Sequence, residues 1–168
     1  MNKVMLVTGG SRGIGAATVR LGAKRGYAVA INYQQRADVA QNLMDEINDG
    51  GGKAIIIQAN VSVESEIIEM FNQVDQQLGP LTAFVNNAGI IQPPKPLVEM
   101  TRERLQELFD VNILGAVLCA REAVKRMSTR LGGSGGAIVN LSSAAAKMGG
   151  PNSFLDYAAS KGAIDTFT

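Results

Sequence analysis

The 168 residues suit one domain, and 16 Lys and Arg against 15 Asp and Glu give a net charge of +1, without a basic cluster that would favour nucleic acid. With no histidine and one cysteine, the chain has no Ser-His-Asp triad, intrachain disulfide or zinc site, and we expect no metal. No apolar run reaches about 18 residues and no signal-peptide pattern is present, which predicts a cytoplasmic protein without a membrane span. The single cysteine, Cys119, lies in an Ala-rich helical pattern and is interpreted as a small core residue.

A strand, a glycine-rich turn and a helix are predicted at the start of the chain. The apolar run at residues 4–7 is typical of a strand buried on both faces, and apolar residues recur at helical spacing from Ile14 to Leu21. Between them, residues 8–15 read Thr-Gly-Gly-Ser-Arg-Gly-Ile-Gly, with the spacing Gly-x-x-x-Gly-x-Gly. Such a turn lets backbone N–H groups approach a phosphate at a helix N-terminus. The alternative is a purely structural turn.

The end of the second predicted strand, residues 28–31, bears on the choice of nucleotide. A site for NAD usually carries Asp or Glu here to bind the ribose 2′-hydroxyl, but this chain has Asn32. An anionic 2′-phosphate is repelled by a carboxylate and attracted by arginine, which Arg12 and Arg36 can supply. We therefore expect NADP rather than NAD. The alternative is that Arg12 is simply solvated.

Strands and helices alternate along the rest of the chain. Apolar stripes predict helices over residues 37–47 and 64–78, with Ser62 as the N-terminal cap of the second. The alternation predicts an α/β fold in a single domain over residues 1–168, a Rossmann-like doubly wound parallel sheet of strand order 3-2-1-4-5. The strands are predicted over residues 4–7, 28–31, 54–57, 81–85 and 137–141.

Polar residues interrupt the apolar pattern after the fourth strand. The segment Asn-Asn-Ala-Gly at residues 86–89 stands at the carboxyl end of that strand, where small residues permit close approach of a ligand. A long helix is predicted over residues 101–127, and Asn112 lies in its apolar stripe. A buried amide without partners costs about 1–3 kcal/mol. Asn112 is therefore either a structural hydrogen-bonding residue or part of a site.

Serines occur on both sides of the fifth strand. Residues 132–136 match Gly-x-Ser-x-Gly literally, but they precede a strand and no histidine exists to act as base, so we interpret them as a flexible turn. Ser142 and Ser143 follow the strand, at the edge of the sheet where α/β folds bind ligands. The alternative is that they merely form a turn.

Tyr157 and Lys161 are four residues apart, so they lie on one face of a helix if the segment is helical. An ammonium beside a phenol favours the phenolate and turns the phenol into a usable acid-base group. The pattern Tyr-x-x-x-Lys is common by chance, and the alternative is a surface helix. The motifs that precede it favour the functional interpretation.

Together these motifs resemble the short-chain dehydrogenase/reductase family, over residues 3–168. The glycine-rich turn and the end of the second strand are most similar to NADP-preferring members such as ketoreductases and the glucose dehydrogenase-like group. The resemblance rests on Thr8-Gly9-x-x-x-Gly13-x-Gly15, Asn86-Asn87-Ala88-Gly89, Asn112, Ser143 and Tyr157-x-x-x-Lys161.

The resemblance implies an NADP-dependent oxidoreductase that acts on a small carbonyl or alcohol. Tyr157 would be the general acid in reduction and the general base in oxidation, and Lys161 would favour its ionised form and bind the nicotinamide ribose. Ser143 would hydrogen-bond the substrate oxygen, and Asn112 would hold a water in the proton relay to Lys161. The residues implied to bind the cofactor are Gly9, Ser11, Arg12, Gly13, Ile14, Gly15, Asn32, Asn60, Val61, Asn87, Ala88, Gly89, Tyr157 and Lys161.

The sequence departs from the family pattern in three places. Asn60 stands where many members have Asp, and one additional residue separates Ser143 from Tyr157. The chain also stops within the apolar stripe of its last helix, whereas members continue through two more strands and a substrate-covering lid. We therefore expect a C-terminally truncated chain whose intact form is a homo-oligomer. The alternative functions are a non-catalytic nicotinamide-nucleotide-binding or sensing protein and an S-adenosylmethionine-dependent methyltransferase, which has no need of Tyr-x-x-x-Lys.

Overall fold

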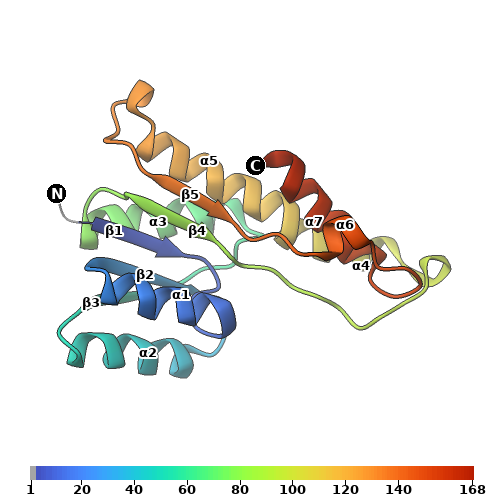
Figure 1. The fold of residues 1–168 in the computed structure, drawn as a ribbon, viewed down its shortest axis with the longest axis horizontal. Coiled ribbons are helices and arrows are strands. Elements are labelled where there is room, and N and C mark those ends of the chain that lie inside the picture. The colour runs from blue at the N-terminus through green and yellow to red at the C-terminus, as the bar shows by residue number, and fades with distance from the viewer. Residues whose placement is uncertain (1–2) are drawn as a thin grey trace.

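The computed structural model describes residues 3–168, which form a five-stranded parallel sheet with helices on both faces (Figure 1). The strand order is β3-β2-β1-β4-β5, so the predicted α/β, Rossmann-like doubly wound sheet and its order are confirmed. The strands are β1 (Lys3–Val7), β2 (Tyr27–Tyr33), β3 (Lys53–Gln58), β4 (Ala83–Asn86) and β5 (Ala137–Asn140).

Seven α-helices are found in the described part of the chain, and the first three each connect two strands that are consecutive in the sequence. Short 3-10 helices occur at Leu97–Glu99 and Thr129–Leu131. A membrane-crossing helix is not found within residues 3–168, where every helix is too short or too polar to serve as one. The α-helices are α1 (Gly13–Lys24), α2 (Ala37–Asp49), α3 (Glu64–Leu78), α4 (Arg102–Phe109), α5 (Ala116–Met127), α6 (Ala145–Met148) and α7 (Leu155–Phe167).

Two apolar layers hold the helices on the sheet. On one face, Val19 of α1 and Leu43 of α2 pack against the strands. On the other face, α3 and α5 pack through a larger cluster in which the rings of Phe71 and Phe84 lie 5.5 Å apart. Cys119 is fully buried in this second cluster, as expected for a small core residue, and burial raises the pKa of its thiol to about 12. Both faces of the central strands are therefore covered, which accounts for their continuous apolar runs.

The parallel register brings the carboxyl ends of the strands together. Val7 lies opposite Ile31 on one side and Val85 on the other, and Asn86 lies opposite Asn140. The segments that leave these strands therefore start at one edge of the sheet, the edge at which α/β folds bind ligands.

The long helix predicted over residues 101–127 is not continuous. A π-helical segment, Asp110–Gly115, separates α4 from α5 and contains Asn112. Gly115 explains part of this geometry, since a Cβ there would overlap the carbonyl oxygen of Val61 in the segment after β3. π-Helical turns interrupt α-helices rarely and are frequent at functional sites.

The prediction that Ser62 caps α3 is wrong. Val63 precedes the helix, and no side chain caps its first turn. The Ser62 hydroxyl instead donates to Oδ1 of Asn60 at 2.9 Å, so this serine closes a local turn just before the helix.

Candidate functional site

The glycine-rich turn after β1 is held from two neighbouring strands. The amide of Asn87, after β4, donates to the carbonyl oxygens of Thr8 and Gly9 at 2.8 and 3.1 Å. From the other side, the Gly9 N–H donates to Oδ1 of Asn32 at the end of β2, at 3.1 Å. The turn is thereby fixed before any ligand arrives.

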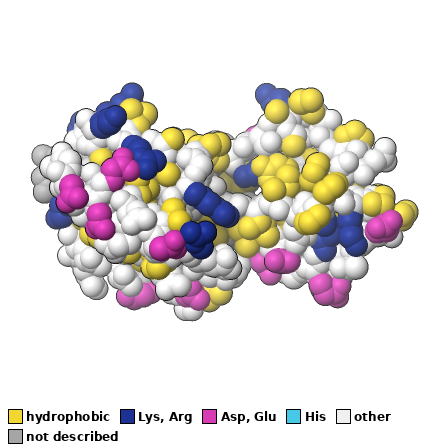
Figure 2. Space-filling view, turned by 90° about the horizontal axis from the view of Figure 1, so that it is seen from below, with side chains coloured by type: hydrophobic (Ala, Val, Ile, Leu, Met, Phe, Trp, Pro, Cys, Tyr) yellow, Lys and Arg dark blue, Asp and Glu magenta, His cyan; other side chains and the backbone are white. Residues whose placement is uncertain are grey.

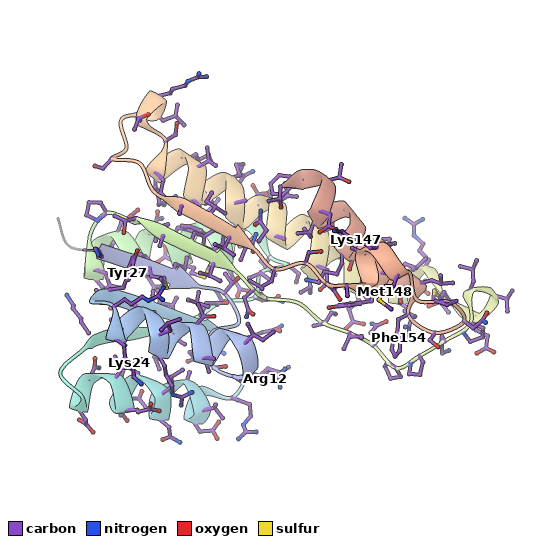
Figure 3. All side chains as sticks on the ribbon, viewed as in Figure 1. Arg12, Lys24, Tyr27, Lys147, Met148 and Phe154 are labelled. Atoms are coloured by element: carbon purple, nitrogen blue, oxygen red, sulfur yellow. The ribbon has the colours of Figure 1, made fainter. Side chains whose placement is uncertain are left out.

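The outer side of this turn is open. Gly13 has φ +55°, and a Cβ there would meet nothing within 4 Å. No side chain caps the first turn of α1, so its free N–H groups and partial positive charge are available to an anion. Arg12 precedes the helix and is exposed, and Figure 3 shows it projecting from that end of α1. These features suit a phosphate. Gly9, Ser11, Ile14 and Gly15, which were predicted to bind the cofactor, lie in and beside this turn.

Asn32 lies inside the protein, which the sequence did not predict. Its side chain is 2% exposed; its oxygen accepts from Gly9, and its NH₂ donates to the carbonyl oxygen of Ala59 at 3.0 Å. Asn32 thus supports the turn from inside the protein. Arg36, the second expected cation, is exposed and pairs with Asp38 at 2.8 Å.

The predicted adenine-facing residues follow β3. Oδ1 of Asn60 accepts from the backbone N–H and the hydroxyl of Ser62, so this oxygen is already engaged in a turn. The backbone N–H of Asn60 donates to the carboxylate of Glu66 at 2.7 Å. Val61 is buried and belongs to the core under α3 and α5. Both residues lie at the carboxyl end of β3, on the same edge of the sheet as the glycine-rich turn.

A second cluster assembles around Lys161, from four separate segments. Its ammonium donates to the carbonyl oxygen of Leu141, just after β5, at 2.7 Å. An added Cβ on Gly89 would lie 3.6 Å from that ammonium and 3.3 Å from Oδ1 of Asn112, so the lack of a side chain at Gly89 keeps this space free. The structure thus brings together Gly89, Asn112, Leu141 and Lys161, which are far apart in the chain.

Lys161 is the electrostatic centre of this cluster. It is 6% exposed, and burial lowers the pKa of its ammonium. The ammonium lies 5.8 Å from the ring centroid of Tyr157, on the same face of α7, as the four-residue spacing predicts. The tyrosine itself is half-buried.

Asn112 has a saturated side chain. Its oxygen accepts from the N–H of Ile90 at 2.8 Å, and its NH₂ donates to the carbonyl oxygen of Ile90 and to Oγ of Ser160, at 2.9 and 3.1 Å. Both ends of the Asn112 amide are therefore used to fix the segment after Gly89 beside α7.

Ser143 lies at the mouth of a surface hollow. Its hydroxyl accepts from the N–H of Ala145 at 3.2 Å, at the start of α6, and its side chain is half-buried. Ser142 donates to the carbonyl oxygen of Lys161 at 3.2 Å. The hollow is lined by Ser142, Ser143, Ala144, Lys147 and Asp165.

Residues 87–89 connect the two parts of the candidate site, since Ala88 lies against Gly9 of the turn and Gly89 lies beside Lys161. Seen from below, the molecule is hollowed between the part built on the sheet and the part that carries α4, α6 and α7 (Figure 2). Arg12 stands at the end of α1 that faces the second part, on which Lys147 and Met148 lie (Figure 3). Apolar side chains gather on that second part, where Met148 is 80% exposed and Val98 is 93% exposed.

Four supporting residues were given no role by reasoning from the sequence, although Thr8 belongs to the glycine-rich motif. The hydroxyl of Thr8, which is fully buried, accepts from the N–H groups of Asn87 and Ala88 at 3.0 and 3.1 Å. Asp156 accepts from the N–H of Tyr157, Ser160 donates to the carbonyl oxygen of Tyr157, and Arg104 pairs with Asp156. The sequence offered two signals for such residues: Thr8 directly follows a strand, and Asp156 directly precedes the candidate catalytic Tyr157. Among residues 3–168, no group of His, Cys, Asp and Glu side chains is arranged to hold a metal ion.

Known proteins resemble the chain over its whole described length. The uncharacterized oxidoreductase YgfF of Escherichia coli is 53% identical over 165 residues, covering 98% of this chain and 67% of that protein. A chloroplastic NADPH-dependent aldehyde reductase-like protein of Arabidopsis thaliana is 38% identical, covering 98% of this chain and 63% of that protein. The crystal structure of a blue fluorescent protein from a metagenomic library, in complex with NADPH, gives a TM-score of 0.90 at 36% identity, covering 99% of this chain and 66% of that one.

These relatives are longer, since the chain spans 67% and 63% of the lengths of the two curated proteins. The family model described as short chain dehydrogenase matches residues 3–168. The resemblance drawn from the sequence motifs is thereby confirmed. The chain belongs to the short-chain dehydrogenase/reductase family, whose members are NAD(P)-binding oxidoreductases.

Proposed function

We propose that the intact protein transfers hydride between NADP(H) and a small carbonyl or alcohol, with Tyr157 as the acid/base residue. The observation that carries the proposal is the convergence of Gly89, Asn112 and Lys161 beside the face of α7 that bears Tyr157. A buried ammonium next to a phenol, with open space at Gly89, suits proton transfer to a bound substrate. The related blue fluorescent protein was crystallised with NADPH, and the Arabidopsis relative is named as an NADPH-dependent aldehyde reductase-like protein, and both support the same chemistry.

Each side chain then has a defined task. NADPH, when bound, supplies the hydride, and the protein supplies orientation and the proton. The Tyr157 hydroxyl gives its proton to the substrate oxygen in reduction and takes it back in oxidation. The Lys161 ammonium stabilises the phenolate left behind, strongly because it lies in a water-poor setting. Asn112, whose amide is committed to Ile90 and Ser160, fixes the segment beside Lys161 instead of holding a water with its side chain.

The glycine-rich turn and Arg12 are assigned to the cofactor. The open side of the turn at Gly13 and the uncapped start of α1 suit the pyrophosphate. Arg12 is exposed beside that turn and has no acidic partner among the salt bridges of residues 3–168, so it can pair with a 2′-phosphate. We therefore propose NADP as the preferred nucleotide.

The test is Tyr157→Phe in the intact protein, assayed for NADPH-dependent reduction of a panel of aldehydes and ketones. Removing the acid/base hydroxyl should lower kcat by about 10²–10⁴-fold while NADPH still binds. Tyr27→Phe is the matched control, because Tyr27 begins β2 at the opposite edge of the sheet, where Lys3 lies over its ring. Unchanged turnover in Tyr157→Phe would refute the acid/base role of Tyr157. Binding of NADPH without turnover in the wild type would instead favour the non-catalytic nucleotide-binding function.

A further inference from the structure

A buried ion pair involves the residue that precedes Tyr157. Nε of Arg104, on α4, is 2.8 Å from Oδ2 of Asp156, the residue before Tyr157. The side chain of Asp156 is 0% exposed and that of Arg104 is 11% exposed. The pair joins α4 to the first turn of α7, across 52 positions of sequence.

The same carboxylate also holds the backbone of Tyr157. Oδ1 of Asp156 accepts from the N–H of Tyr157 at 2.8 Å. This N–H belongs to the first turn of α7, where backbone donors have no partner within the helix. One oxygen of Asp156 thus faces α4 and the other faces Tyr157, so the position of the tyrosine backbone depends on the position of Arg104.

A second tie fixes the other polar group of the same residue. Oγ of Ser160 donates to the carbonyl oxygen of Tyr157 at 2.7 Å and accepts from Asn112. Both the N–H and the C=O of Tyr157 are therefore held by side chains that are themselves anchored, on α4 and on the π-helical segment. Because both ties end on other elements, they fix the backbone of Tyr157 relative to α4 and to the π-helical segment.

Stability alone accounts poorly for the ion pair. Buried charge pairs lose most of their attraction to desolvation, and apolar replacements of similar volume are often as stable. Here the pairing is also incomplete, since Nη2 of Arg104 is buried without a hydrogen-bond partner. Such a pair is better explained by the orientation that it imposes on α7.

We propose that Arg104 is a positioning residue, which acts through Asp156 to set the Tyr157 hydroxyl against Lys161 and the substrate. This inference rests on the proposed function of Tyr157. A shift of about 1 Å at a reacting group can cost about a hundredfold in rate, so a loosened first turn of α7 is enough to slow the reaction. The glycine-rich turn lies on β1 and α1, away from this pair, so cofactor affinity should not respond.

The test is Arg104→Met in the intact protein, with kcat expressed per NADPH-binding site from a fluorescence titration. We expect kcat per site to fall by at least about tenfold while KM for NADPH stays within about twofold. Arg104→Lys, which keeps a donor, should recover part of the rate. Arg102→Met is the control, because Arg102 lies on the same helix and is exposed.

A second variant covers the case in which an unpaired Asp156 prevents folding. The double variant Arg104→Met with Asp156→Asn removes both charges of the pair, and the Asn oxygen can still accept from the Tyr157 N–H. It should fold and show the same loss of kcat per site. Wild-type kcat in the folded single or double variant overturns the proposal.

Hydrogen exchange separates this inference from the proposed function. The amide of Tyr157 should exchange at least about tenfold faster in Arg104→Met, with α1 unchanged, whether or not the protein turns over NADPH. Faster exchange together with an inactive wild type would refute the proposed function, while it would still show that Arg104 holds the Tyr157 backbone through Asp156. Unchanged exchange, or faster exchange with unchanged kcat, refutes the positioning role.

Discussion

Gly15→Ala tests how tightly the glycine-rich turn is built. Gly15 is in the first turn of α1, and an added Cβ would lie 2.8 Å from Nδ2 of Asn87 and 3.0 Å from Cα of Gly10, and would overlap the carbonyl oxygen of Gly9. Two of these neighbours are backbone atoms, and the third is already bound to Thr8 and Gly9. No neighbour is free to give way, so the start of α1 has to move off the turn.

The magnitude follows from these distances. Carbon atoms pack at about 3.5–4.0 Å, so the helix start must shift by about 0.5–1 Å. Overpacking of this kind costs about 1–3 kcal/mol, and we expect the upper half of that range because the obstacle is backbone. The displaced N–H groups are those assigned to the phosphates, so NADPH affinity should fall by at least about tenfold, or about 1.4 kcal/mol.

Urea unfolding followed by circular dichroism and NADPH titration are the two assays, since the chain has no tryptophan. Gly22→Ala on the same helix is the matched control. Its Cβ would meet the Sδ of Met5 at 2.9 Å, but that side chain is flexible and can move. Gly22→Ala should therefore be neutral or stabilising by up to about 1 kcal/mol, with unchanged NADPH affinity. A Gly15→Ala protein with the wild-type urea midpoint and NADPH affinity would refute the reasoning.

Three further predictions concern single side chains. Burial opposes ionisation of Glu122, but hydrogen bonds from three basic neighbours hold its pKa below the usual 4.5. Ionised Glu122 therefore stabilises the folded protein above pH 4.5, and this stabilisation is lost as the pH falls through the folded pKa. Glu122→Gln should lower the urea midpoint at pH 7 and converge on wild type in acid, and a gap that persists in acid would contradict this. The thiol of Cys119, buried and with its pKa raised to about 12, should resist iodoacetamide until urea unfolds the protein. Arg12→Ala should weaken NADPH binding by about tenfold and leave NADH binding unchanged in calorimetric titrations, whereas equal losses would argue against 2′-phosphate recognition.

The sequence by itself determined the architecture. Apolar runs, apolar helix faces and glycine-rich turns predict the order of the elements along the chain. The Rossmann-like doubly wound arrangement then predicts the sheet order β3-β2-β1-β4-β5. The same local information placed Tyr157 and Lys161 on one helix face, because a spacing of four residues is a property of the helix alone. A motif whose residues are close in the sequence can be predicted without knowing which segments pack against it.

The partners of the polar side chains were decided only by the tertiary structure. Asn32 accepts a hydrogen bond from the glycine-rich turn, and Asn112 lies in a π-helical segment. Ser62 donates to Asn60 in a local turn instead of capping a helix. Arg104 and Asp156 met across 52 positions of sequence. A hydrogen bond or ion pair is fixed by which distant segment lies within about 3 Å, and that depends on the packing of the whole domain, which no local spacing specifies.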